Sequence, residues 1–191
     1  MAVTYGTGKQ ALLDAAIRVV SAEGLRGLTY RSVAAEAGVS HGSVRYHFGD
    51  WSSLVEAAVT YSVERSIAGS ELAAASDDFG EFAGSLASLV EADPDTQTFQ
   101  YELALESRRR PELLPIIERV YETYRSAVRE TLQRNGIDDE PLVQMVFSAL
   151  DGLVFQQTVF GDPDRTRAGV DVLRNLIAAH PHRRVSEDRA G

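Results

Sequence analysis

The run from Ser40 to His47 places several side chains that could make directional contacts close together in the sequence. It holds two serines, two histidines, an arginine and a tyrosine within eight residues. The guanidinium of Arg45 can donate two parallel hydrogen bonds to a pair of acceptors such as O6 and N7 of guanine. The hydroxyl and imidazole groups can donate to phosphate oxygens or to base edges. The run therefore predicts contact with a nucleic acid.

Two short helices must position these side chains. Thr29 is suited to cap the first helix and Ser40 the second, and Gly38 between them allows a tight turn. Val44 and Phe48, four residues apart, form an inward face. The outward face is then His41, Gly42, Ser43, Arg45, Tyr46 and His47. Two helices joined in this way form a helix-turn-helix, whose second helix can enter a major groove.

The stretch LTYRSVAAEAGVSHGSVRYHF, preceded by LLDAA at 12–16 and by Gly24, resembles the N-terminal DNA-binding domain of the TetR family of transcriptional regulators. The resemblance covers about residues 9 to 60. It implies a three-helix DNA-binding head, a connecting fourth helix and a five-helix regulatory body. It also implies a homodimer formed through the last two long helices and a small-molecule effector pocket in the body.

The resemblance assigns roles to individual residues. Thr29 and Tyr30 fall where the family contacts phosphate, and Arg31 falls where a first-helix side chain can reach a base. The recognition helix is covered by Ser40, His41, Gly42, Ser43, Arg45, Tyr46 and His47. Trp51 stands where the family usually has a lysine; it cannot neutralise a phosphate, although its indole N–H can donate. Arg45 replaces a common aromatic residue, which predicts a different operator sequence.

Helical periodicity and caps predict an all-α fold of about nine helices, with a helix-turn-helix head and a larger helical regulatory and dimerisation domain. Beyond the head, helices are expected at about 77–91, 95–110, 111–135, 140–160 and 163–179. The predicted organisation is a DNA-binding domain at 1–50, a ligand-binding and dimerisation domain at 51–182, and a frayed tail at 183–191.

Charge separates the head from the rest of the chain. Residues 1–50 carry five bases and four acids, whereas the other 141 residues carry 14 bases and 24 acids. The acidic body would therefore repel a phosphate backbone more strongly than the head would. The chain has no cysteine, and its longest uncharged stretches are ten residues, against the roughly 20 apolar residues of a membrane span. We expect a cytoplasmic protein with no membrane contact.

Polar residues within apolar helical stripes are the candidates for an effector site. They are Tyr61, Phe99, Glu102, Glu106, Tyr121, Tyr124, Gln156 and Gln157. Together they would suit a mostly apolar ligand with a few polar groups, although each could also be an ordinary core or surface residue. Ser148 and Gly152 are candidates for close helix approach at a dimer interface, with packing inside one subunit as the alternative. No cofactor and no metal are expected.

Two motifs that could indicate an enzyme lack the structural context that they need. Gly38 to Gly42 match the G-x-S-x-G of serine hydrolases, but that motif needs a preceding strand and a parallel sheet. The four histidines form no E-x-x-H pair of the kind a di-iron bundle uses. Arg108 to Arg110 are better explained by the helix dipole than as a nucleic-acid patch.

The sequence thus predicts a ligand-responsive, sequence-specific transcriptional regulator, a repressor by family resemblance. Its predicted partners are double-stranded operator DNA, a second copy of the chain and a small molecule. The alternative is an all-α adaptor with a vestigial head, followed by an all-α enzyme. DNA binding that improves after sequence selection separates the regulator from both.

Overall fold

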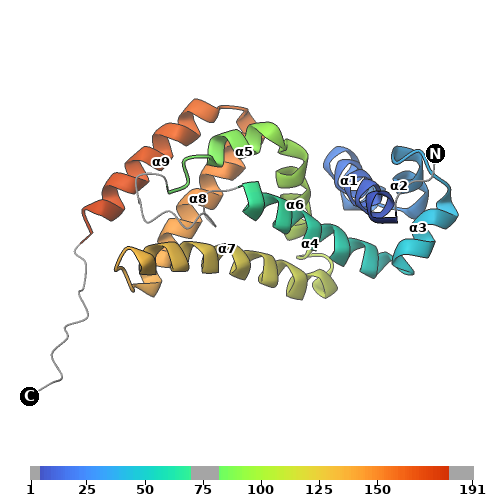
Figure 1. Cartoon of the computed structure of the whole chain (residues 1–191), viewed down its shortest axis with the longest axis horizontal. Coiled ribbons are helices and arrows are strands. Elements are labelled where there is room, and N and C mark those ends of the chain that lie inside the picture. The colour runs from blue at the N-terminus through green and yellow to red at the C-terminus, as the bar shows by residue number, and fades with distance from the viewer. Residues whose placement is uncertain (1–4, 70–81, 181–191) are drawn as a thin grey trace, which may run out of the picture. The chain divides into compact units, whose positions relative to one another are not determined.

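The computed structural model describes residues 5–69 and 82–180, and within these ranges every regular element is a helix. The elements, of which Figure 1 labels the α-helices, are α1 (Tyr5–Glu23), η1 (Leu25–Gly27), α2 (Tyr30–Glu36), α3 (His41–Phe48), α4 (Trp51–Gly69), α5 (Leu86–Ala92), α6 (Pro94–Glu106), η3 (Pro111–Leu113), α7 (Leu114–Arg134), α8 (Glu140–Phe160) and α9 (Pro163–Ala178). The all-α prediction is confirmed.

The chain divides into two compact units. The first combines Met1–Ser66 with Ala92–Val120, and the second combines Ile67–Glu91 with Tyr121–Gly191. The first unit thus holds the three head helices together with α6. The functional boundaries at residues 50 and 182 stay predictions, and the predicted tail at 183–191 lies outside the described residues.

The helix-turn-helix forms as its caps predict. Thr29 Oγ1 accepts from the backbone N–H of Ser32 at 3.0 Å, while Ser32 Oγ accepts from the backbone N–H of Thr29 at 2.9 Å. Ser40 caps α3 by accepting from the backbone N–H of Ser43 at 3.3 Å. Gly38 in the turn has φ +66°, a conformation that costs a glycine little. These bonds fix where α2 and α3 begin.

A small apolar core holds the head together. Val33 of α2 and Val44 of α3 are completely buried, and Phe48 is nearly so. On α1 the buried residues include Ile17 and Val20, which follow the helical spacing seen in the sequence. Because Val44 and Phe48 face inward, the intervening polar residues of α3 are left on the outside.

Arg65 joins three helices of the first unit. From α4, its Nη1 donates to Asp14 of α1 at 2.6 Å, and its Nη2 donates to Asp93. Asp93 is also the N-cap of α6, accepting from the backbone N–H of Thr96 at 3.2 Å. A second bond from Ser21 to Asp95, 2.7 Å long, ties α1 to α6. The head helix α1 is thereby fixed to the start of α6.

The contact between α4 and α6 is unusually polar for a buried surface. Ser62 and Ser66 of α4 are buried, and they accept hydrogen bonds from Gln100 at 3.1 Å and Gln97 at 3.4 Å. Buried polar groups must find partners, so these pairs set the alignment of the two helices.

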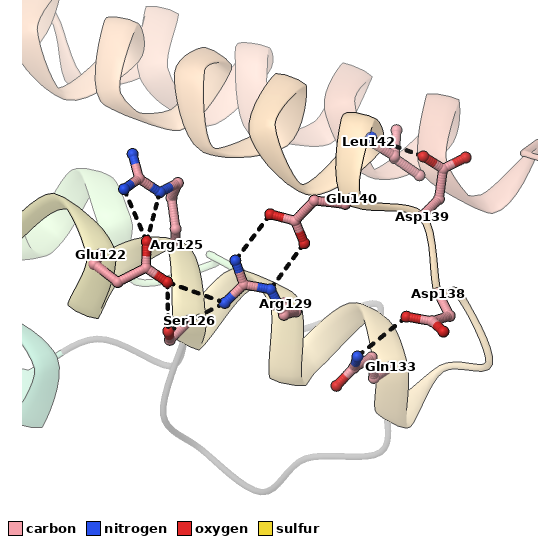
Figure 2. Close-up of polar contacts among 9 residues, drawn as sticks. All are labelled: Glu122, Arg125, Ser126, Arg129, Gln133, Asp138, Asp139, Glu140 and Leu142. Carbon is pink, nitrogen blue, oxygen red and sulfur yellow. Dashed lines mark hydrogen bonds and ion pairs between the residues drawn. The ribbon is translucent and has the colours of Figure 1, made fainter.

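In the second unit, arginines join α7 to α8. Arg129 donates to both carboxylate oxygens of Glu140 at 2.9 Å and to Glu122 at 3.3 Å, and Arg125 donates twice to Glu122 (Figure 2). The hydrogen bonds from these arginines lower the pKa of Glu122 and of Glu140. The network therefore contributes stability at neutral pH that is lost as the carboxylates are protonated in acid.

The last two helices, α8 and α9, pack side by side in the second unit (Figure 1). A side chain added at Gly169 of α9 would lie 2.5 Å from Leu153 of α8, so the glycine permits this approach. Helix α8 is long and apolar enough to cross a membrane by length and composition, and 33% of its most apolar window is buried.

The helix predicted at 77–91 is wrong at residues 82–85. The structure begins α5 at Leu86, and residues 82–85 form a turn in which Ala83 has φ +56°. Residues 77–81 lie outside the described part of the chain. The helix predicted at 95–110 ends at Glu106. The three arginines 108–110 thus lie beyond the last helical turn.

Candidate nucleic-acid interface

All ten residues predicted to contact DNA are accessible. Thr29, Arg31, Ser40, His41, Gly42, Arg45 and Tyr46 are exposed, and Tyr30, Ser43 and His47 are half-buried. The side chain of Tyr46 is the most prominent apolar one, with 71% of its surface exposed. Exposure of this whole set is what a recognition helix and its flanks require.

Arg31 and Arg45 are available for a ligand. Neither has a carboxylate within 4.0 Å among the described residues, although Arg18 nearby pairs with Glu36 at 2.6 Å. A surface ion pair was the alternative explanation of Arg45, and the structure does not provide one in the part of the chain that it describes. Its bidentate donor pair is therefore free to meet a base edge.

The hydroxyl groups of the interface are partly engaged. The Oγ atoms of Ser40 and Ser43 lie 3.0 Å apart and are hydrogen-bonded to each other, so both hydroxyl groups are held in place at the start of α3. Tyr30 donates to the carbonyl of Gly49 at 3.1 Å, and its ring packs edge-on against His41. Burial raises the pKa of Tyr30, and Asp50 adds to the rise. Tyr30 is therefore neutral at physiological pH and braces α2 against both ends of α3.

Trp51 does not offer its indole N–H to a phosphate. The Nε1 group donates to the carbonyl of Leu28 at 3.0 Å, and the ring is half-buried. The guanidinium carbon of Arg110 lies 5.2 Å from the centre of the same ring. The first residue of α4 thus serves as a packing platform rather than as a donor to DNA.

The eight effector candidates are divided between the two units. Tyr61, Phe99, Glu102 and Glu106 lie in the first unit, and Tyr121, Tyr124, Gln156 and Gln157 in the second. Phe99 is completely buried in the core, whereas Gln156 is exposed. A role for these residues in one site stays a prediction.

Two hollows of the first unit involve candidates. One, of about 670 Å³, is lined by α1, α4 and His47 and includes Tyr61. Another, of about 540 Å³, is lined by Glu102, Leu105, Glu106, Arg108 and Arg109. Arg109 and Arg110 pair with the buried Glu106 at 2.9 and 3.4 Å. A side-chain carboxylate, and not only the helix dipole, therefore explains two of the three arginines.

In the second unit, Gln157 is the candidate with an open bonding position. It is 4% exposed, and its Nε2 donates to the carbonyl of Ala87 at 2.8 Å. Its Oε1 has no hydrogen-bond partner among the described residues. Tyr121 packs edge-on against Phe147, and burial raises its pKa, with Asp151 adding to the rise. Neither Tyr121 nor Gln157 forms part of the nucleic-acid face.

Sequence reasoning missed Arg65 and Arg110. Arg65 lies 51 residues from Asp14 and 28 from Asp93, so no local spacing connects them. The run Arg108 to Arg110 stood out in the sequence and was assigned to the helix dipole, but no local spacing placed Arg110 beside Trp51.

Comparison with known proteins agrees with this geometry. Residues 12–58 match the model of bacterial regulatory proteins of the tetR family, and residues 77–179 match the tetracyclin repressor-like C-terminal domain. The second match alone covers more than half of the chain. The chain belongs to the TetR family. The predicted head, the all-helical architecture and the assignment as a DNA-binding regulator rather than an enzyme are thereby confirmed.

Three relatives illustrate the similarity of this TetR-family chain to known proteins. The HTH-type nicotine-responsive transcriptional repressor HdnoR of Paenarthrobacter nicotinovorans is 26% identical, covering 90% of this chain and 93% of its own. A TetR-family member from Streptomyces coelicolor A3 is 31% identical with a TM-score of 0.70, and the match covers 88% of this chain and 97% of the other. The multidrug binding protein EbrR, complexed with imidazole, is 32% identical with a TM-score of 0.64, and the match covers 92% of this chain and 97% of EbrR.

Replacing Arg45 by alanine tests direct base reading in this TetR-family chain. If Arg45 reads guanine, the variant loses preference at one operator position, worth about 1 to 3 kcal/mol, and keeps its dependence on salt. The measurement is competition binding on duplexes selected from a random pool, each with one base pair changed. Arg18→Ala, on the exposed surface of α1, is the control. Uniform weakening on all duplexes would assign Arg45 to the phosphate backbone instead.

Proposed function

We propose that the chain is a cytoplasmic repressor that binds a near-palindromic operator as a homodimer and is released by a small-molecule effector. The observation that carries the proposal is the exposed, polar α3 with an arginine that no described carboxylate neutralises. Residues 1–50 would read DNA, and 51–182 would bind the effector and the second copy. Two heads related by a two-fold axis would read half-sites about 34 to 36 Å apart, or a multiple of that.

An apolar stripe on α8 supports the homodimer. Met145, Phe155 and Val159 are 68%, 44% and 56% exposed. Together with Ser148 and Gly152 they follow the alternating spacing of three and four residues that two packed helices use.

The neighbouring helix α9 adds to this apolar surface. Val172 and Leu176 are 58% and 65% exposed. Among the described residues, a side chain added at Gly152 of α8 would meet nothing within 4 Å, so packing against that part of the chain does not explain the glycine. A surface this apolar is covered by a partner in a stable protein, and we assign it to a second copy rather than to lipid.

The effector is proposed to be an aromatic molecule that carries an N–H donor or a positive charge. HdnoR is named for its response to nicotine, and EbrR has been solved with proflavin, malachite green and ethidium. In this chain, Gln157 offers a buried acceptor with its amide already fixed by Ala87. Leaving such an acceptor unsatisfied costs about 1 to 3 kcal/mol, which a ligand donor would offset.

Coupling between effector and DNA is proposed to pass through α6. The bonds from Arg65 hold Asp14 of the head and Asp93 of α6 together. A ligand that favours a different position of α6 would favour a different position of the head. The coupling would be of the order of 1 to 3 kcal/mol and reciprocal between the two ligands.

Gly152→Arg tests the dimer and the operator together. The added side chain would place two charges in the proposed interface, so the variant is expected to be a monomer by light scattering. In selection from random duplexes, the wild type should enrich a two-fold repeated motif and the variant should not. Ala35→Arg, at an exposed position of α2, is the oligomerisation control and should stay dimeric. A monomeric wild type, or a variant that remains dimeric, would contradict the proposed interface.

Gln157→Leu tests the effector class. Thermal unfolding of the ligand-free variant establishes that it is folded, because the substitution removes both the unsatisfied acceptor and the hydrogen bond to Ala87. Binding of proflavin to the DNA-free protein, measured by calorimetry, should weaken about tenfold. The adjacent exposed Gln156→Leu is the control and should bind as the wild type. Unchanged binding by Gln157→Leu would exclude Gln157, and a wild type that binds neither proflavin nor nicotine would exclude the ligand class.

A further inference from the structure

The start of α4 lies where the family resemblance predicts a phosphate contact, but its first residue, Trp51, carries no positive charge. Trp51 occupies the first position of α4, and its indole N–H is already bonded to the carbonyl of Leu28. Leu28 immediately precedes Thr29, the N-cap of α2. Tyr30 reaches back to the carbonyl of Gly49, two residues before Trp51. The beginnings of α2 and α4 are therefore adjacent.

A cation from a distant part of the sequence lies against this corner. The guanidinium of Arg110, between α6 and η3, stacks 5.2 Å from the centre of the Trp51 ring. Its side chain is 34% exposed, so it is in contact with solvent while it is held in place. A planar guanidinium can stack on an aromatic ring and still direct N–H groups outward, which a lysine cannot do as well.

The carboxylate of Glu106 does not neutralise the full positive charge of the two arginines that pair with it. Glu106 is a single carboxylate shared by two arginines, and the shorter contact, 2.9 Å, goes to Arg109. The contact to Arg110 is 3.4 Å and involves its Nε. No carboxylate other than that of Glu106 pairs with Arg110 within 4.0 Å in the described part of the chain. Its guanidinium can therefore bind a further anion.

We propose that Arg110 contacts a phosphate of bound DNA next to the one met by Thr29 and Tyr30. It supplies from the α6 side the positive charge that Trp51 cannot supply at the start of α4. The Trp51 ring is the platform that orients the guanidinium, and Glu106 holds it from the other side. The inference rests on the DNA-binding function and adds a residue outside the helix-turn-helix to the interface.

The test is the salt dependence of DNA affinity. Fluorescence anisotropy would follow a labelled duplex selected from a random pool and a mixed-sequence duplex of the same length, over a range of NaCl concentrations. For Arg110→Ala, the slope of log K against log salt should become shallower by about 0.9 for each subunit bound. Affinity for both duplexes should fall by the same factor, because a phosphate contact carries no sequence information.

Two further variants make the test specific. Arg109→Ala removes the other partner of Glu106 without touching Trp51, and it should keep the wild-type slope. Trp51→Lys in the Arg110→Ala background should restore the slope by placing a cation at the start of α4. Thermal unfolding of each variant establishes that it is folded.

Several outcomes would overturn the inference. An unchanged slope for Arg110→Ala, or an equal loss for Arg109→Ala, would show that Arg110 makes no specific contact. Failure of Trp51→Lys to restore the slope would place Arg110 away from the phosphates near α4. A wild type that binds neither duplex would instead contradict the DNA-binding function itself, so the two failures are distinguishable.

Discussion

The double ion pair of Arg65 is the interaction on which the first unit depends. One guanidinium, carried by α4, meets Asp14 of the head and the N-cap of α6. Helices that begin 89 residues apart, α1 at Tyr5 and α6 at Pro94, are thereby held in one compact unit. Together with the bond from Ser21 to Asp95, this connection ties the head to the start of α6.

The same construction explains how a protein with a net charge of −9 can approach DNA. Acidic residues of the first unit are used internally: Asp14 and Asp93 by Arg65, and Glu106 by Arg109 and Arg110. Arg45 on α3 is left without a carboxylate partner among the described residues. Local arrangement of charge, rather than overall charge, decides whether a phosphate backbone is attracted.

The local features of the fold could be predicted from the sequence, and the long-range ones could not. Caps at Thr29 and Ser40, and the glycine turn at Gly38, depend on residues close in sequence, and the structure contains all three. The contacts of Trp51 depend on a carbonyl 23 residues away and on an arginine that follows α6, and neither is close to it in sequence. The helix predicted at 77–91 was wrong at 82–85, which form a turn with Ala83 at φ +56°, a conformation that helical spacing does not reveal. Helical spacing identified Gln157, but its unpaired oxygen was visible only in the structure.

Native-state hydrogen exchange of the full-length protein tests the connection made by Arg65 most directly. If α1 and α6 form one cooperative unit, their slowest amides should share one opening free energy, and Arg65→Met should lower both equally. Arg119→Met, which removes an exposed ion pair with Glu56 in the same unit, is the reference and should leave both unchanged. Amides of α6 that lose protection while those of α1 keep theirs would contradict the account.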